Sequence, residues 1–205
     1  MSWSADDPFV RRPKPSTMFV LIFGLTIFGL GDAIIVSAVW GVTPWTVLAM
    51  GLAEQLGTTI GRATFLVSII VLALWIPLRE KPGIGTLLNI IIIAAMIDIA
   101  LPHLPTPTST FASLLTVIAG TALIAIGSGF YLTANLGPGP RDGWMTGLHR
   151  KTGISIGIVR TVIECSALLL GWMLGGDVGF GTLVFAITIG PMVSGVLWVL
   201  SKKKI

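Results

Sequence analysis

Long apolar stretches alternate along the chain with short segments rich in glycine, proline or charge. Six apolar runs stand out, at about residues 18–40, 60–78, 84–101, 111–136, 156–174 and 180–200. Each is close to the roughly 20 residues that a helix needs to cross the hydrocarbon layer of a bilayer. Helix-breaking segments separate them, such as residues 79–83, 102–107 and 137–142. The pattern predicts an all-α membrane protein with six transmembrane helices.

The composition supports a membrane protein and excludes a soluble enzyme. Of the 205 residues, 54% are apolar and 11% are charged, whereas about a quarter of an ordinary soluble domain is charged. The formal net charge of +4 would raise nucleic-acid binding in a soluble protein. Here the positions of the basic residues have another explanation, given by membrane topology. We therefore expect the lipid bilayer, and no nucleic acid, as a partner.

The distribution of lysine and arginine predicts the orientation of the six spans. Eleven basic residues fall on the side that holds both ends of the chain, while the opposite loops hold only Arg62. Basic residues collect on the cytoplasmic side of bacterial membrane proteins. We expect residues 1–17 to form a cytoplasmic tail, and the protein to lie in the plasma membrane with both termini cytoplasmic. The eleven are Arg11, Arg12, Lys14, Arg79, Lys81, Arg141, Arg150, Lys151, Lys202, Lys203 and Lys204.

An internal repeat appears when the chain is aligned with itself at an offset of 96 residues. Glycines and prolines match across the two copies, as in the pairs Gly31/Gly127, Gly41/Gly137, Pro44/Pro140, Gly57/Gly153, Gly61/Gly157 and Gly83/Gly179. Such matches indicate matched backbone geometry. The copies are residues 18–110 and 111–205. Because each contains three spans, the second must enter the membrane from the opposite side, which predicts an inverted 3+3 repeat.

The connector after the first span of each copy is unusual. It contains Pro44 followed by Trp45 in the first copy, and Pro140 followed by Arg141 and Asp142 in the second. Proline favours the first turn of a helix. We expect a short helix at each connector, either interfacial or re-entrant. A re-entrant helix would present unpaired N–H groups to a binding site, whereas an interfacial one would only join two spans.

Charged residues inside the spans are candidates for function because their insertion is costly. Asp32 lies in the first span, and Arg160 and Glu164 lie one helical turn apart in the fifth. The latter two can form an ion pair, or Arg160 can hold an anionic solute group while Glu164 exchanges protons. Asp32 can pair with Arg62, unless Arg62 simply extends to the headgroups.

Chemistry of other kinds fits the sequence poorly. No His, Cys, Asp or Glu residues have the spacing of metal ligands, and no histidine lies in a span to activate a serine. A Walker A loop is also absent. We expect neither an enzyme nor a bound cofactor or metal.

Several segments also resemble the YczE-type integral membrane proteins of bacteria. The resemblance is carried by the Pro44-Trp45 connector, residues 82–86, the Gly-Pro-Arg-Asp-Gly segment at 139–143 with its flanks, Arg160 with Glu164, and residues 179–182. It covers nearly the whole chain after the tail. It implies a plasma-membrane protein whose biochemical function is mostly unassigned. That family usually has Asp at the position of Thr46.

Together these features predict a secondary transporter or channel for a small solute. The binding site is expected between the two repeats and is formed by Asp32, Pro44, Trp45, Arg141, Asp142, Arg160 and Glu164. The alternative is a membrane scaffold or regulator that docks a partner through its cytoplasmic loop at residues 141–151. Glycine-rich helix faces also permit a homodimer.

Overall fold

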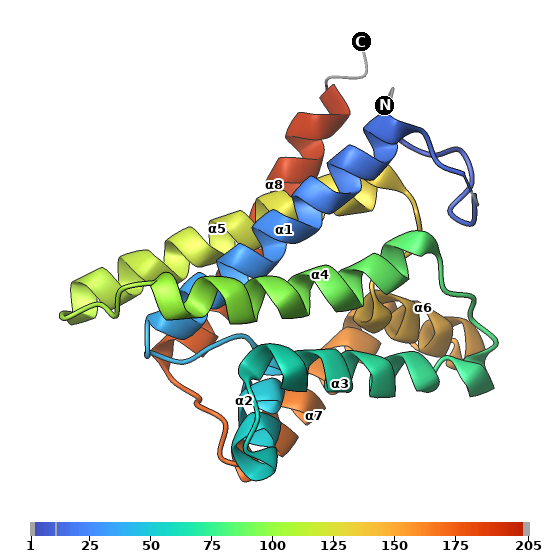
Figure 1. The fold of residues 1–205 in the computed structure, drawn as a ribbon. Helices are drawn as coiled ribbons and strands as arrows, with labels where there is room; N and C mark the ends of the chain where they lie inside the picture. Colours follow the sequence, from blue (N-terminus) through green and yellow to red (C-terminus); the bar gives the residue numbers. More distant parts are fainter. Residues whose placement is uncertain (1–2, 11, 203–205) are drawn as a thin grey trace.

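The structure is a computed structural model that describes residues 3–10 and 12–202. Arg11, Lys203 and Lys204, which contributed to the predicted orientation, lie outside this range. The described residues form eight α-helices and two short 3-10 turns, Ile76–Leu78 and Leu101–His103. The α-helices are α1 Pro15–Ser37, α2 Pro44–Leu56, α3 Ile60–Ala73, α4 Ile84–Ala100, α5 Thr110–Ala134, α6 Pro140–Thr152, α7 Ile156–Met173 and α8 Phe180–Lys202 (Figure 1).

The six-span prediction agrees with these helices. Within the described residues, six helical segments are long and apolar enough to cross a bilayer: Pro15–Ser37, Ile60–Leu78, Ile84–His103, Thr110–Ala134, Ile156–Met173 and Phe180–Lys202. The first lies about three residues earlier than predicted. Its helix begins at Pro15, which suits a first turn, and ends before Val39, whose φ is +48°. Large apolar side chains remain exposed on these helices, as expected of surfaces that face lipid.

The two halves of the chain repeat the same element bounds at the offset found in the sequence. Helix α6 begins and ends 96 residues after α2, and α7 begins 96 residues after α3. Gly41 and Gly137 both have positive φ, of +96° and +105°. The backbone hydrogen bonds that link the two halves are matched as well. Gly85 N–H donates to Leu136 O at 2.7 Å, and its counterpart Gly181 N–H donates to Trp40 O at the same distance.

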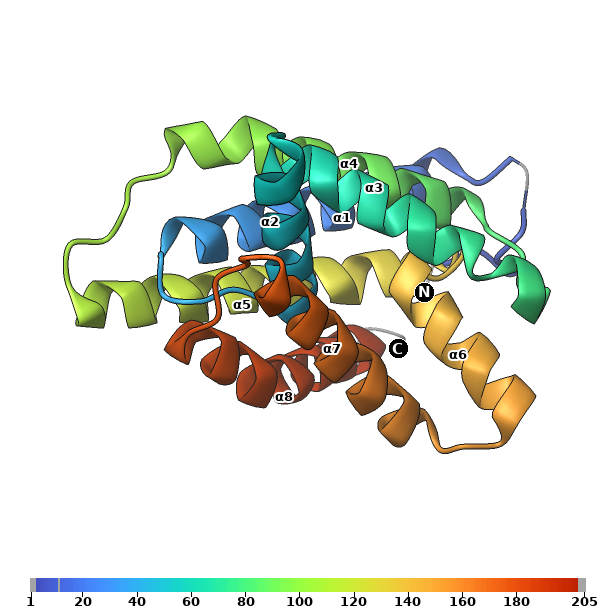
Figure 2. The same ribbon diagram turned by 90° about the horizontal axis from the view of Figure 1, so that it is seen from below.

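Helices α1 and α5 pack against each other through small residues at the centre of the molecule. A Cβ added to Gly24 would lie 2.9 Å from Gly127 O, and one added to Gly31 would lie 2.7 Å from Gly120 O. Only glycine allows so close an approach of two helix backbones. A second view shows α2 crossing the other helices (Figure 2).

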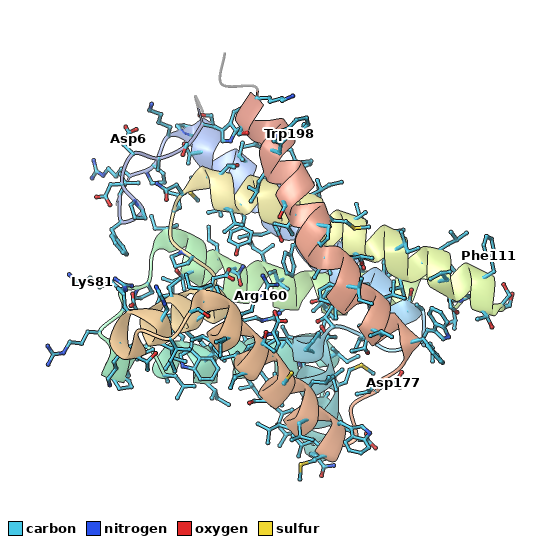
Figure 3. The ribbon with its side chains drawn as sticks, turned by 180° about the vertical axis from the view of Figure 1, so that it is seen from behind. Asp6, Lys81, Phe111, Arg160, Asp177 and Trp198 are labelled. Carbon is cyan, nitrogen blue, oxygen red and sulfur yellow. The ribbon has the colours of Figure 1, made fainter. Side chains whose placement is uncertain are left out.

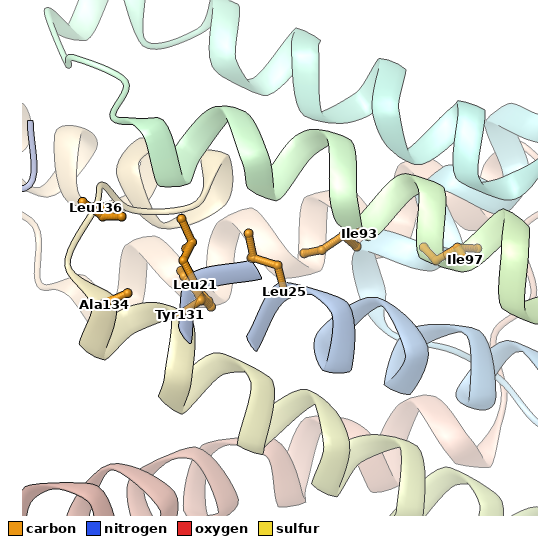
Figure 4. Close-up of a cluster of buried hydrophobic side chains, with 7 residues drawn as sticks. All are labelled: Leu21, Leu25, Ile93, Ile97, Tyr131, Ala134 and Leu136. Atoms are coloured by element: carbon orange, nitrogen blue, oxygen red, sulfur yellow. The ribbon is translucent and has the colours of Figure 1, made fainter. Parts of the chain in front are cut away.

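A buried apolar cluster joins α1, α4 and α5 on one side of this contact (Figure 4). Leu21 and Leu25 of α1 meet Ile93 and Ile97 of α4, and Tyr131 of α5 completes the cluster together with Ala134 and Leu136. The cluster fixes α4 against the central pair of helices. It leaves the Tyr131 hydroxyl free to reach the neighbouring α6.

The two halves differ in the contact between their second and third spans. Helix α3 packs along α4, where Asp98 accepts from the Thr59 hydroxyl at 2.6 Å and from Gly61 N–H at 2.8 Å. The matched residues of the second half are Ser155, Gly157 and Ser194. Ser155 makes no cap hydrogen bond, and nothing outside the helix's own backbone lies within 4 Å of a Cβ placed on Gly157. Within the described chain, α7 and α8 therefore lack the packing that joins α3 to α4.

Candidate functional site

A cavity of about 190 Å³ lies at the centre of the molecule, and every α-helix contributes to its wall. Six of the seven predicted site residues line it: Pro44, Trp45, Arg141, Asp142, Arg160 and Glu164. The seventh, Asp32, lies behind the wall with 1% of its surface exposed. The cavity extends between α7 and α8, where Ile163 faces Ile189 and Val193. Figure 3 views the molecule from this side, with Arg160 labelled between the two diverging helices.

The two proline-led connectors place helix N-termini at the cavity. Pro44 and Pro140 each occupy the first turn of a short helix. Helix α2 is largely buried, so it does not lie on the surface of the molecule. The Thr43 hydroxyl caps α2 by accepting from Thr46 N–H at 3.3 Å. The matched position in α6 is Gly139, which has no side chain to provide a cap.

Helix α6 is fixed by Trp75, at the end of α3. The Trp75 indole N–H donates to Pro140 O at 2.8 Å. A Cβ added to Gly143 would lie 2.0 Å from an atom of the indole ring. Glycine at 143 thus leaves room for the ring against α6, and the hydrogen bond sets the position of the helix start. This contact aims the side chains of the first turn of α6 toward the cavity.

Arg141 and Trp45 occupy matched positions in the two halves and lie against each other. The Arg141 guanidinium carbon is 4.8 Å from the centre of the Trp45 ring, a cation–π contact. Burial lowers the pKa of Arg141, and the carboxylates of Asp32 and Asp142 oppose that shift. The guanidinium stays protonated because its ordinary pKa is far above neutral. It supplies a fixed positive charge at the cavity.

Each of the three carboxylates at or behind the cavity wall accepts from a neighbouring side chain. Asp32 accepts from the Thr46 hydroxyl at 2.9 Å, and Asp142 accepts from the Tyr131 hydroxyl. Glu164 accepts from Arg160 Nε at 2.9 Å, which is the ion pair allowed by their spacing. Arg160 and Glu164 are half exposed along the cavity. Their pairing reduces the cost of placing charges in a membrane span.

The pairing of Asp32 with Arg62 is wrong. Asp32 is buried against Thr46, whereas Arg62 is exposed on α3. The structure records no ion pair between them in the part of the chain that it describes. Instead, Asp32 accepts from the Thr46 hydroxyl in the first turn of α2, and the positive charge that acts on it is that of Arg141.

Sequence reasoning missed Tyr131. Tyr131 lines the cavity and holds Asp142. It is the single tyrosine of the chain and lies within an apolar run, a signal that could have identified it. Asn89 of α4 also lines the cavity. Asp98, near the end of α4, caps α3.

Comparisons with known proteins agree with the resemblance noted from the sequence. A family model described as "Family of unknown function (DUF6198)" matches residues 15–197. An uncharacterised protein of Haemophilus influenzae is 42% identical over 201 residues, which cover 98% of this chain and 91% of that protein. The uncharacterised membrane protein YczE of Bacillus subtilis is 32% identical over 174 residues, covering 84% of this chain and 78% of the relative. No solved structure matches significantly.

Proposed function

The chain belongs to the family of unknown function DUF6198 and is a multi-pass membrane protein of the YczE type; from its geometry we propose that it is a small secondary carrier. Its solute would bind in the central cavity, against the polar side chains of α2, α6 and α7. The cavity supports this role because it brings together five charged or aromatic side chains from three helices, α2, α6 and α7. They are Trp45, Arg141, Asp142, Arg160 and Glu164. A water-soluble solute needs such polar side chains to bind inside the membrane-spanning part of a protein.

The carrier proposal includes an inverted 3+3 repeat. Each half holds three spans and one short proline-led helix, with bounds that recur at the 96-residue offset. The reciprocal bonds Gly85 to Leu136 and Gly181 to Trp40 support a two-fold relation between the halves. With three spans in each half, such an axis would lie in the membrane plane, as in many secondary transporters.

The observation that carries the proposal is the unequal closure of the two halves. Helices α3 and α4 close on each other through Asp98, whereas α7 and α8 diverge and leave the cavity between them. Two copies of one unit in different arrangements are what alternating access requires. In the second state α7 would pack on α8, and α3 would leave α4.

The basic residues fix the direction of this opening within the proposal. Their distribution supports an orientation with the N-terminus of α7 and both chain ends on the cytoplasmic side of the plasma membrane. The structure then corresponds to a carrier that is open toward the cytoplasm. The contact of Thr59 and Gly61 with Asp98 would be the extracellular gate in its closed form.

The position of Arg141 favours a carrier over a scaffold that docks partners through residues 141–151. Its guanidinium lies over Trp45 at the cavity, so it is not presented on an outer surface. A docking loop would expose its charged side chains to the partner, which holds for Arg150 and Lys151 of this segment but not for Arg141.

Access to the cavity from both sides of the membrane tests the carrier. Ser68 of α3 lines the cavity, and Cys165 is exposed, so Ser68→Cys is made together with Cys165→Ser. We expect an impermeant thiol reagent to label Cys at 68 in right-side-out and in inside-out vesicles. Thr121→Cys, at a fully buried position outside the cavity wall, is the control and stays unlabelled. Labelling from one side only, or from neither, would contradict the proposal.

A further inference from the structure

Some hydrogen-bond donors at the cavity have an acceptor and others do not, and this difference indicates the chemical class of the ligand. All three carboxylates already accept a hydrogen bond. Arg141 donates none to any residue that the structure describes; its recorded contact is the face of Trp45. A guanidinium has five N–H donors arranged to bind a carboxylate through two parallel bonds. The Arg141 guanidinium therefore has unused donors at the cavity, and a carboxylate of the solute is a group that fits them.

Asn89 adds a second unused donor beside Arg141. Its amide lines the cavity and makes no hydrogen bond within the described chain. A Cβ placed on Gly139 would lie 3.3 Å from Asn89 Nδ2 and 3.3 Å from Asp142 Oδ2, so the amide and this carboxylate both lie against the start of α6. Backbone N–H groups at a helix start also attract anions. Asp142 already supplies a carboxylate at this helix start, so Arg141 and Asn89 are the two unused donors at this end of the cavity.

The charges of the site argue against a simple anion. On the cavity wall, Asp142 and Glu164 carry two negative charges and Arg141 and Arg160 carry two positive ones, so the wall has no net charge. A bare carboxylate would add an uncompensated negative charge away from water, where charge burial is costly. A simple amine would add an uncompensated positive charge and leave the donors of Arg141 and Asn89 without an acceptor.

A solute that carries both a carboxylate and a cationic group adds no net charge and supplies an acceptor for Arg141 and Asn89. We infer, on the basis of the proposed carrier, that the ligand is a small zwitterion whose carboxylate binds Arg141 and Asn89 and whose cationic group faces Asp142 and Glu164. The cavity volume of about 190 Å³ compares with a cavity of roughly 150 Å³ that holds benzene. Apolar wall residues such as Phe28 and Phe185 leave room for a short apolar side chain. A small neutral amino acid has this size and charge.

Thermal unfolding of the purified full-length protein with matched compounds tests the ligand class. The zwitterions are glycine, L-alanine, L-valine and glycine betaine. For valine, isobutylamine lacks the carboxylate, isovalerate lacks the amine, and isobutanol lacks both charges. We expect at least one zwitterion to raise Tm by about 5 to 10 °C at a hundred-fold excess over its Kd. We expect no rise with the amine, the carboxylate or the alcohol.

Two variants tie the effect to this site. Arg141→Gln abolishes the rise in Tm, and Asn89→Ala weakens it if the first variant fails to fold. Arg150→Gln is the matched control on the same helix, because Arg150 is exposed and pairs with Glu80 outside this cavity. An equal rise with isobutylamine or isovalerate, or no rise with any zwitterion, overturns the inference. The two-sided labelling of Ser68→Cys reports separately on the carrier, so the two failures are distinguishable.

Discussion

Among the described residues, Asp32 is the one charged residue that is buried, with 1% of its surface exposed. Its carboxylate accepts from Thr46, whose hydroxyl is also 2.7 Å from that of Thr43. This chain of polar groups ties α1 to the start of α2. In the second half the acid is on the short helix, at Asp142, and the hydroxyl is on the long one, at Tyr131. Each half thus joins its first span to its connector by an acid and a hydroxyl.

Removing the hydroxyl of Thr46 tests this role. Thr46→Val leaves Asp32 buried without its donor, and we expect the free energy of unfolding to fall by about 1 to 3 kcal/mol. Thr188→Val is the control, because the Thr188 hydroxyl donates to Val184 O in its own helix and its loss should cost much less. Chemical denaturation in detergent measures both. Equal losses in the two variants would show that the Thr46–Asp32 bond is not important for stability.

The elements were predictable where backbone chemistry defines them. Pro44 and Pro140 mark the starts of α2 and α6, and Gly57 and Gly153, both with positive φ, mark their ends. The lengths of the apolar runs predicted the spans, because they reflect the thickness of the bilayer. The sequence could not predict the partner of Asp32, since that depends on which face of α2 meets α1. The hydropathy pattern carries no such information.

The contact of Asp98 with the start of α3 suggests a substitution that would bring α7 onto α8. Ser194→Asp gives α8 the carboxylate that α4 has at Asp98, placed for Ser155 and Gly157. A carboxylate at a helix start contributes about 0.5 to 2 kcal/mol, so we expect α7 to spend more time on α8. Labelling of Ser68→Cys from the cytoplasmic side should then slow several-fold.

Ser201→Asp is the control for this change. Ser201 is exposed on α8, seven residues beyond Ser194 and nearer the end of the helix. An acid at 201 cannot reproduce the Asp98 contact and should leave the labelling rate unchanged. Faster labelling in Ser194→Asp, or equal slowing in both variants, would contradict the proposed closure.

At the scale of the whole molecule, the proposed function depends on the difference in helix packing between the two halves. The repeat in the sequence predicted two similar units, and the bounds of α2 and α6 agree with it. It could not predict that α3 packs on α4 while α7 leaves α8. Both halves carry the same glycine spacing, Gly57/Gly61 and Gly153/Gly157, so the pattern is compatible with either arrangement. The choice between the two is a matter of conformational state.

The most direct test of alternating closure is a disulfide between Ser155→Cys and Ser194→Cys in membranes, in the Cys165→Ser background. The matched pair Thr59 and Asp98 is in contact at 2.6 Å, whereas Ser155 and Ser194 lie on helices that diverge. If α7 closes on α8, a mild oxidant should cross-link this pair and block cytoplasmic labelling of a cavity cysteine. The control pair, Ser155→Cys with Ser201→Cys, should stay unlinked. Failure of the 155–194 pair to cross-link, with both cysteines reactive toward a thiol reagent, would contradict the carrier mechanism.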